Sequence, residues 1–531
     1  MRLPRFTWLL FAMALAGCQL LAGIDEKRAA PSADAGRACT TNQECIDAND
    51  HDASVCVHPE GTCQPLITST CPRLLGSIAN DDVLLLGFVQ DLRGANAGTG
   101  NARMNSAELA ISEITATARG VPGGANGAPR PIAMLACTEN ADASSAADPE
   151  VPGRFLVDTL HVPAILGAGN SGTTIQLARD LTIPRGALLF APSATSEAIT
   201  DLQPRGASPR LVWRTAPSNT IQAKALRLQV NALEAAVRAQ AGNGAIDVRL
   251  AVVVKGDAFG TGLWSLTQAG LTINGADASD PANPSVLSRQ YAAAPTSAEM
   301  ASIAAKVQSF APHIILSIGT GEAISGILTP IEAGWSAAHP TQAKPQWLFT
   351  DGGQATQLLG AASDMELRTR VRGTVPGSRG PLYDAFVNRY TQVYADQPPV
   401  TFGSAGAYDI VYLLAYAAAA ASTSTADSGP LTGARLVSGL LRAVSNDPSA
   451  LRIDVGTLGL LHAFQELQSG RAIKFTGASG PLDFDAAVGE APSDIDVWCI
   501  SQNGPAVFRS SGVYYAADAG ALVGTFACPR N

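Results

Sequence analysis

Two short segments of the chain place small hydroxyl residues directly after apolar runs. The apolar runs cover residues 164–166 and 188–190, and each has the pattern of a buried strand that ends at glycine or proline. A strand end that passes into a helix offers backbone N–H groups and partial positive charge, and hydroxyls add orientable donors. The two segments therefore predict a site for a small carboxylate-bearing ligand, formed by Ser171, Thr173, Ser193, Ala194 and Thr195. Taken singly, each hydroxyl is more typical of an ordinary helix cap.

The composition excludes several classes of function. Hydrophobic residues make up 46% of the 531 residues and charged residues 15%, so the chain can bury enough core for two or three domains. The formal net charge of −9 and the absence of a basic run argue against nucleic acid or an anionic membrane surface as partner. The six histidines are scattered, with no zinc-type spacing and no G-x-S-x-G motif, so we expect no metal, no cofactor and no catalytic residue.

The N-terminus has the layout of a secretory signal peptide. Arg2 and Arg5 precede an apolar core, residues 8–15, which is too short to span a bilayer as a finished helix. The small residues before Cys18 resemble a bacterial lipobox, which predicts cleavage after residue 17 and a lipid on Cys18. The alternative is an ordinary signal peptide with a chance cysteine.

The predicted lipid would be the protein's attachment to the membrane. Residues 18–38 are rich in small residues and predict a flexible tether. Gln19, in place of the aspartate associated with inner-membrane retention, favours the Gram-negative outer membrane. We therefore expect an exported lipoprotein that is tethered and not embedded.

Export changes the interpretation of the other eight cysteines. Residues 39–71 hold five of them in a polar stretch too small for its own core, which predicts a disulfide-rich, EGF-like module. A metal-binding knuckle is the alternative, and an oxidising compartment disfavours it. Pairing within the whole set stays open: Cys39, Cys45, Cys56, Cys63, Cys71, Cys137, Cys499 and Cys528.

From residue 81 onward, strand and helix patterns alternate. Apolar runs of strand length recur at 83–88, 132–136, 164–166, 188–190, 250–254, 314–316 and 347–349, with helical spacing between them. This alternation predicts an α/β fold with two doubly wound parallel sheets, and such sheets bind ligands beyond the carboxyl ends of their strands.

Several separated motifs, in the same order, resemble the type I periplasmic binding proteins, specifically the branched-chain amino-acid (Leu/Ile/Val) receptors of ABC importers. The resemblance covers about residues 80 to 500. The motifs are VLLLGFVQDLRGANAGTGNARMNSAELAISEI, APSATSEAITDL, VWRTAPSNTIQAKAL, VVKGDAFGTGL, FTDGG, RGTVPGS, TFGSAGAYDIVYLLA and SGPLDFD.

The resemblance implies two lobes that close over a ligand and are joined by three crossing strands, near Arg214, Pro376 and Asp485. It divides the chain into a first lobe (80–214 with 377–484), a second lobe (215–376 with 485–500) and a C-terminal extension (501–531). It also implies a small-molecule ligand and an ABC permease as partners.

Two patterns further along the chain belong to the first lobe in this scheme. Leu382, Phe386, Tyr390 and Val393 share one side of a helix that should return to that lobe. Tyr408 and Tyr412 are expected in its core, because aromatic residues at helical spacing usually pack there.

The resemblance also implies residue roles. Ser171 or Thr173, with Ser193, Ala194 and Thr195, match the positions that hold the ligand's carboxylate in the family. Phe259 matches the covering aromatic, where a tyrosine is common. Glycine stands at or beside the usual second-lobe acid, so Asp351 is the nearest carboxylate, with Glu322 as another candidate. These departures argue against an ordinary α-amino acid as ligand.

Two alternatives stay open beside a transport receptor. Residues 167–172 match the dinucleotide fingerprint G-x-G-x-x-G, but the next strand lacks the acid that would bind a ribose, and NAD is scarce outside the cytoplasm. The other alternative is a ligand sensor or scaffold with the same lobes, which the sequence does not separate from transport.

Overall fold

The computed structural model describes residues 36–141, 147–241, 246–377, 379–395, 399–423 and 429–529. The chain forms two compact units, Met1–Pro65 and Leu66–Asn531. The predicted signal peptide, Cys18 and nearly all of the predicted tether lie outside the described residues.

The first unit contains a small module held by two disulfides. A short helix, α1 (Asn42–Ala48), precedes a hairpin of β1 (Ser54–Val57) and β2 (Thr62–Pro65). Disulfides join Cys39 to Cys56 and Cys45 to Cys63, and these sulfurs form the centre of the module. So few residues cannot bury a sufficient apolar core, and the disulfides supply the missing stability. The prediction of disulfide bonds here is confirmed.

The other four cysteines pair within the second unit. Cys71 bonds to Cys137, and Cys499 bonds to Cys528. Cys71, which the sequence placed at the end of the module, therefore ties the start of the second unit to the strand that contains Cys137. The sequence alone could not have chosen between these pairings.

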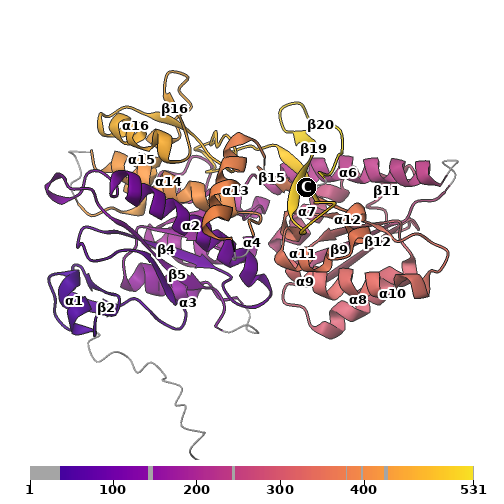
Figure 1. The fold of residues 1–531 in the computed structure, drawn as a ribbon, viewed down its shortest axis with the longest axis horizontal. Helices are drawn as coiled ribbons and strands as arrows, with labels where there is room; N and C mark the ends of the chain where they lie inside the picture. The colour runs from indigo at the N-terminus through magenta and orange to yellow at the C-terminus, as the bar shows by residue number, and fades with distance from the viewer. Residues whose placement is uncertain are drawn as a thin grey trace, which may run out of the picture. The chain divides into compact units, whose positions relative to one another are not determined.

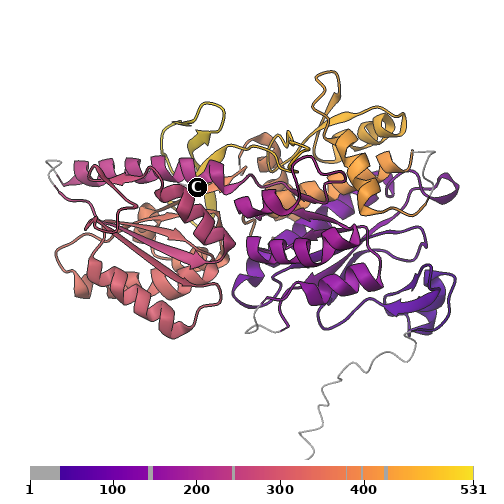
Figure 2. The ribbon, with the colours of Figure 1, turned by 180° about the vertical axis from the view of Figure 1, so that it is seen from behind.

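The first lobe of the second unit is built on a six-stranded sheet with the order β3-β5-β4-β6-β7-β8. Its strands are β3 (Arg73–Gly76), β4 (Leu84–Gln90), β5 (Ile132–Thr138), β6 (Ala164–Gly167), β7 (Leu188–Ala191) and β8 (Val212–Arg214). All pair in parallel except β3, which is antiparallel to β5 at the edge. Figures 1 and 2 show helices on both faces of this sheet, which explains why β5, β6 and β7 are buried along their whole length.

The helices of the first lobe come from two separate parts of the chain. They are α2 (Ala97–Ala118), α3 (Glu150–Arg154), α4 (Ser171–Leu177), α5 (Ile183–Arg185), α13 (Pro381–Val393), α14 (Ser404–Ala421), α15 (Gly433–Ala443) and α16 (Thr457–Gln468). A small parallel pair, β16 (Leu451–Asp454) and β17 (Ile473–Thr476), packs against α15 and α16.

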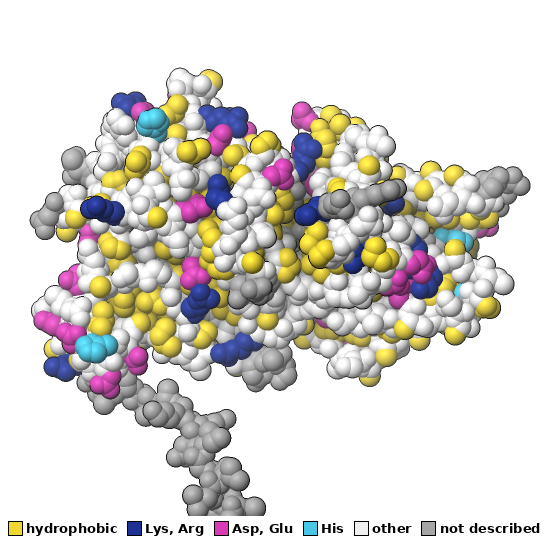
Figure 3. All heavy atoms as spheres, in the orientation of Figure 1, with side chains coloured by type: hydrophobic (Ala, Val, Ile, Leu, Met, Phe, Trp, Pro, Cys, Tyr) yellow, Lys and Arg dark blue, Asp and Glu magenta, His cyan; other side chains and the backbone are white. Residues whose placement is uncertain are grey.

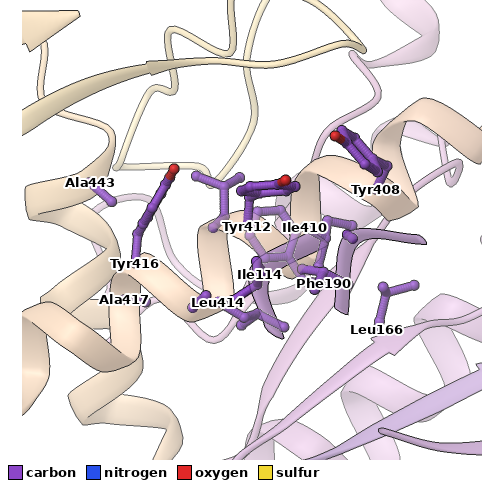
Figure 4. Packing of buried hydrophobic residues seen from close by; sticks show 14 of the residues in the cluster. Ile114, Leu166, Phe190, Tyr408, Ile410, Tyr412, Leu414, Tyr416, Ala417 and Ala443 are labelled. Carbon is purple, nitrogen blue, oxygen red and sulfur yellow. The ribbon is translucent and has the colours of Figure 1, made fainter. Parts of the chain in front are cut away.

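Helix α14 forms the centre of the first-lobe core. All its residues are buried, and apart from Ser404, Asp409 and the tyrosine hydroxyls they are apolar on every side of the helix. Figure 4 shows Tyr408, Tyr412 and Tyr416 along this helix, with Phe190 and Leu166 of the sheet nearby. Among the described residues α14 is also the one helix long and apolar enough to cross a membrane, but its burial in this core accounts for that composition.

The predictions for these aromatic residues are largely confirmed. Tyr408 and Tyr412 are fully buried in the first-lobe core, and Phe386 and Tyr390 of α13 pack into the same core. Val393 was expected on the same buried side, and that was wrong: it is 60% exposed. It is the last residue of α13, so the buried stripe ends before the helix does.

The second lobe is built on an eight-stranded sheet with the order β12-β9-β13-β14-β15-β18-β19-β20. Its strands are β9 (Leu250–Gly256), β12 (Val286–Ala292), β13 (Ile314–Ile318), β14 (Gln346–Phe349), β15 (Val371–Pro376), β18 (Ile495–Ile500), β19 (Phe508–Ala516) and β20 (Ala521–Val523). The first five strands in this order, β12, β9, β13, β14 and β15, pair in parallel. The last three, β18, β19 and β20, pair antiparallel to their neighbours. Residues 501–531, expected as an extension, thus contribute two strands at the sheet edge.

The second-lobe helices cover both faces of this sheet (Figures 1 and 2). They are α6 (Asn219–Gln240), α7 (Ala258–Gln268), α8 (Ser297–Phe310), α9 (Gly321–Ala323), α10 (Thr329–Ala338), α11 (Thr356–Ala361) and α12 (Met365–Arg370). A short hairpin, β10 (Thr272–Ile273) with β11 (Ala276–Asp277), follows α7.

The chain passes between the two sheets at three places. β8 ends at Arg214 and leads into α6, which packs against α7 and β15. β15 ends at Pro376 and leads back to α13, which packs against α2. The third passage follows β17 and reaches β18. The predicted fold, with two mainly parallel α/β lobes, is confirmed. The antiparallel edge strands were missed because β3 and β20 are short and largely exposed.

Candidate functional site

A cavity of about 50 Å³ lies at the carboxyl ends of parallel strands from both lobes. Residues directly after β4, β6, β13 and β14 line it, together with the end of β9 and the start of α2, where the 3-10 turn η1 (Gly94–Asn96) precedes the helix. This is where α/β sheets bind ligands. The lining residues, which we call the charged cavity, are Asp91, Asn96, Thr99, Gly100, Arg103, Gly169, Asn170, Lys255, Thr320, Asp351, Gly352, Gln354, Ala355 and Phe402.

Arg103 is the cation that the first lobe contributes to the charged cavity. It lies in the second turn of α2 and is only 6% exposed. Its Nη1 donates to Gln90 Oε1 (2.9 Å) and to the carbonyl oxygen of Gly169 (2.8 Å), and its Nε donates to the carbonyl oxygen of Phe402 (3.1 Å). Burial lowers the pKa of Arg103 to about 10, so the side chain stays charged at neutral pH.

Three carboxyl groups lie in the neighbourhood of this guanidinium: Glu139 and Asp351 are buried, and Asp91 is partly buried. Burial raises the pKa of Asp91, raises that of Glu139 to about 8 and raises that of Asp351 to about 6. Asp351 accepts a hydrogen bond from Gln222 Nε2 (2.8 Å). Asp91 Oδ1 and Glu139 Oε2 are buried and have no hydrogen-bond partner in the described part of the chain.

Lys255 is the cation from the second lobe, and its charge is compensated. Its Nζ donates to Thr320 Oγ1 (3.0 Å) and lies 3.3 Å from Glu322 Oε1 and 3.8 Å from Asp257 Oδ2. Glu322 also accepts from the Tyr291 hydroxyl (2.8 Å). Glu322, a sequence candidate for binding a positive ligand group, is therefore already occupied by protein donors.

The predicted hydroxyl site, which we call the hydroxyl corner (Ser171, Thr173, Ser193, Ala194 and Thr195), is brought together as expected but does not line the charged cavity. Ser171 Oγ accepts from the backbone N–H groups of Thr195 and Ser196, at 3.2 Å each. Thr173 forms a capping box with Asn170 at the start of α4. The corner therefore satisfies most of its polar groups internally, as helix caps do.

A buried arginine braces the hydroxyl corner from behind. Arg214 Nη1 donates to the carbonyl oxygens of Ser196 (2.8 Å) and Ala194 (3.2 Å). Its Nε donates to Glu490 Oε2 (2.7 Å), so a buried ion pair fixes the arginine. Thr195 Oγ1 is the one hydroxyl of the corner that is buried without any partner among the described residues.

The two residues predicted to contact the ligand from the second lobe, Asp351 and Phe259, lie in different places. Asp351 lines the charged cavity, as expected for a residue that contacts ligand. Phe259 lies instead in the second-lobe core with Leu263 and Trp264, because the first turn of α7 directs it toward the sheet. Its predicted role as a cover for the ligand stays a prediction.

The glycine fingerprint at residues 167–172 has a packing explanation. A Cβ on Gly167 would lie 2.5 Å from the carbonyl oxygen of Val89 in the neighbouring strand. The N–H of Gly169 donates to Glu139 Oε1 and is thus not free for a phosphate. With this N–H already bonded, the turn does not offer the free backbone donors that a pyrophosphate needs, so the arrangement does not fit a dinucleotide.

Within the described ranges, the one group of residues with metal-ligand spacing is Cys39, Cys45 and Cys63. All three sulfurs are bonded in disulfides, which leaves no thiolate for a metal.

The sequence comparison decides the family. A family model described as periplasmic binding protein matches residues 84–503. The chain belongs to the periplasmic binding protein family. Its fold is that of the type I periplasmic binding proteins, and membership implies an extracytoplasmic location. A sequence comparison with curated proteins finds no match.

Solved structures support the fold of this periplasmic binding protein. A leucine-binding protein from Thermotoga maritima has a TM-score of 0.56 at 16% identity, covering 81% of this chain and 98% of that one. A solute-binding protein of an ABC transporter from Rhodopseudomonas palustris, in complex with 3,4-dihydroxybenzoic acid, has a TM-score of 0.58 at 14% identity, covering 82% and 98%. A branched-chain amino-acid transporter substrate-binding protein from Streptococcus pneumoniae, in complex with isoleucine, has a TM-score of 0.54 at 17% identity, covering 80% and 100%.

The sequence missed most of the charged cavity. Arg103, Lys255 and Asp91 were not singled out, because single charged residues in a helix or at a strand end are usually solvated. A usable signal existed for Arg103: it is the one charged residue between positions 94 and 107, in a stretch of small and polar residues. A charge among small residues at the start of a helix is more often buried than one on a charged face.

Proposed function

We propose that this protein is an extracytoplasmic solute-binding lipoprotein that captures a small carboxylate-bearing ligand between its two lobes and delivers it to an ABC importer. Binding is non-covalent, the lobes close over the ligand, and the protein performs no chemistry on it. The relatives of known structure support the general role: their names describe binding of leucine, isoleucine and one aromatic carboxylate, 3,4-dihydroxybenzoic acid.

One observation supports this function more than any other. Residues from both lobes converge on the charged cavity, with Arg103 and Asp91 on one side and Lys255 and Asp351 on the other. A ligand that contacts both sets gains affinity only when the lobes are together, which is the physical basis of ligand-driven closure.

A thermal-shift screen of the mature chain against amino acids, small carboxylates, amides and sugars tests the proposal. A true ligand stabilises the folded state by RT ln(1 + [L]/Kd), so the melting temperature must rise further as the ligand concentration increases. Small-angle scattering of the best ligand's complex should then show a smaller radius of gyration than the free protein. A panel without any concentration-dependent shift would contradict a solute-binding role and favour a scaffold.

The anchor is a separate part of the proposal. Cys18 should be the first residue of the mature chain and carry lipid. Mass spectrometry of the protein from its native membrane should give a lipid-modified N-terminal peptide, and Cys18→Ser should release the protein in soluble form or leave its signal peptide uncleaved. An unmodified Cys18 in the mature protein would refute the anchor without affecting the binding role.

A further inference from the structure

Arg103 is a buried cation whose charge the protein does not balance by direct contact. All three of its hydrogen bonds go to neutral oxygens, of Gln90, Gly169 and Phe402. In the part of the chain that the structure describes, no carboxylate oxygen lies within 4.0 Å of the guanidinium nitrogens of Arg103, so it forms no ion pair. Its Nη2 makes no hydrogen bond to these residues. A buried charge without a partner is costly, and one that faces a cavity is balanced when an anion binds there.

Other buried cations of the chain show that this situation is particular to Arg103. Lys255 and Arg214 each lie beside carboxylates. Arg210 and Arg368 also lack an ion pair among the described residues, but they donate to backbone carbonyl groups and do not line the charged cavity. Arg103 alone among these arginines combines a free Nη2 with a place in the cavity wall.

Two acidic residues close to Arg103 can bind a positive group of the ligand. Asp91 lines the same cavity, and its Oδ1 is buried without a partner. Asp351 faces the cavity from the second lobe. Ala355 and Phe402 are the apolar side chains of the lining, although carbon atoms, including those of glycines and polar side chains, form more of its surface than nitrogen and oxygen atoms do. The space is small, about 50 Å³, so a branched aliphatic or aromatic group placed in it would displace water from Arg103, Asp91 and Lys255, which costs free energy.

We propose that Arg103 Nη2 binds the anionic group of the ligand, and that the ligand is a small dipolar molecule without a large apolar side chain, whose cationic group faces Asp91 and Asp351. This rests on the proposed solute-binding function and deepens it. Arg103 is the anchor for the anion, in place of the hydroxyl corner that the sequence suggested. The two acids select against ligands that carry a carboxylate alone.

Calorimetric titration of the full mature chain with matched probes tests this inference. The probes are glycine, L-serine and L-asparagine, their carboxamides, the 2-hydroxy acids glycolate and glycerate, and, as apolar comparators, L-leucine, L-isoleucine and benzoate. We expect the tightest binding from a polar amino acid, which reverses the expectation from the sequence that an ordinary α-amino acid is not the ligand. Its carboxamide should bind at least about tenfold more weakly, because a charge-assisted hydrogen bond is lost.

The same titrations use Arg103→Gln, Arg103→Lys and, as a matched control, Arg368→Gln, which removes a buried arginine outside the cavity. We expect Arg103→Gln to weaken binding at least about tenfold, Arg103→Lys to retain part of the affinity, and Arg368→Gln to leave it unchanged. If Arg103→Gln does not fold, the comparison of each amino acid with its amide on the unchanged protein still decides.

Each outcome separates the inference from the function on which it rests. Tightest binding of leucine, isoleucine or benzoate, or an unchanged affinity in Arg103→Gln, would overturn the inference while the solute-binding function stands. Equal affinity for acid and amide would do the same. No binding by any probe would count against both.

Discussion

The hydroxyl corner and the charged cavity both lie at the carboxyl edge of the first-lobe sheet, yet they differ in how their polar groups are satisfied. In the corner, Ser171 and the N–H groups of Thr195 and Ser196 bond to one another. In the cavity, Arg103 Nη2 and Asp91 Oδ1 have no partner among the described residues. The residue types alone favoured the corner, and the hydrogen bonds favour the cavity as the place where a ligand is needed.

The difference shows why residue type is a weak guide to a binding site. Hydroxyls at a strand end serve equally well as caps and as ligand contacts, and only their partners distinguish the two uses. The surface follows the same logic: on the face in Figure 3, Lys and Arg are interspersed with Asp and Glu, so exposed charges there are solvated and largely balanced.

The largest expected effect comes from the brace of the hydroxyl corner. Arg214→Met should lower the free energy of unfolding by about 3–5 kcal/mol, because it leaves Glu490 without its partner and frees the carbonyl groups of Ala194 and Ser196. Urea denaturation measures the loss. Arg205→Gln, which breaks an exposed pair with Asp485, is the control and should cost less than about 1 kcal/mol. If both variants lower the free energy of unfolding equally, Arg214 does not stabilise the hydroxyl corner.

A pH series sharpens the contrast, because the cavity contains titrating groups and the hydroxyl corner contains none. Burial raises the pKa of Asp351 from 3.8 to about 6. Between these values the folded state binds more protons than the unfolded state, so raising the pH destabilises the protein. In Asp351→Asn, the fall in the free energy of unfolding between pH 4 and 7 should be smaller by roughly 2–3 kcal/mol. Denaturation curves at several pH values compare the slopes, and identical slopes would contradict a buried ionisable Asp351.

The corner's internal bonding predicts a smaller effect on stability. Ser171→Ala should lower the free energy of unfolding by about 1–3 kcal/mol, because the buried N–H groups of Thr195 and Ser196 lose their acceptor. Ligand affinity, measured by calorimetry, should change less than it does in Arg103→Gln. If Ser171→Ala lowers the free energy of binding more than the free energy of unfolding, the hydroxyl corner and not the charged cavity binds the ligand.

The smallest effect is expected at Thr195. Its Oγ1 is buried without a partner, so Thr195→Val removes an unsatisfied hydroxyl while keeping the shape. The free energy of unfolding should stay within about 1 kcal/mol or rise. Thermal denaturation with and without ligand checks this, and a ligand-dependent loss confined to this variant would mean that the free hydroxyl contacts ligand.

Much of the fold could be predicted because buried parallel strands leave a direct record in the sequence. The runs at 132–136, 188–190 and 250–254 correspond to strands in which nearly every residue is buried. The crossing near Arg214 was expected from the resemblance of residues 212–226 to the corresponding motif of the family. The antiparallel edges, half exposed, left no such record.

The site was predicted only in part because it depends on contacts that are distant in sequence. Arg103 is positioned by Phe402, 299 residues away, and Asp351 by Gln222, 129 residues away. No spacing rule links such pairs. The hydroxyl corner, in contrast, is local and was found, but its internal hydrogen bonds became visible only in three dimensions.

A crystal structure of the protein with the tightest ligand from the titrations tests the central claim most directly. We predict that the ligand occupies the charged cavity with its anionic group within hydrogen-bonding distance of Arg103 Nη2 and its cationic group beside Asp91 or Asp351. A ligand whose anion is held instead by Ser171, Thr195 and the neighbouring N–H groups, with Arg103 left without contact, would contradict the account.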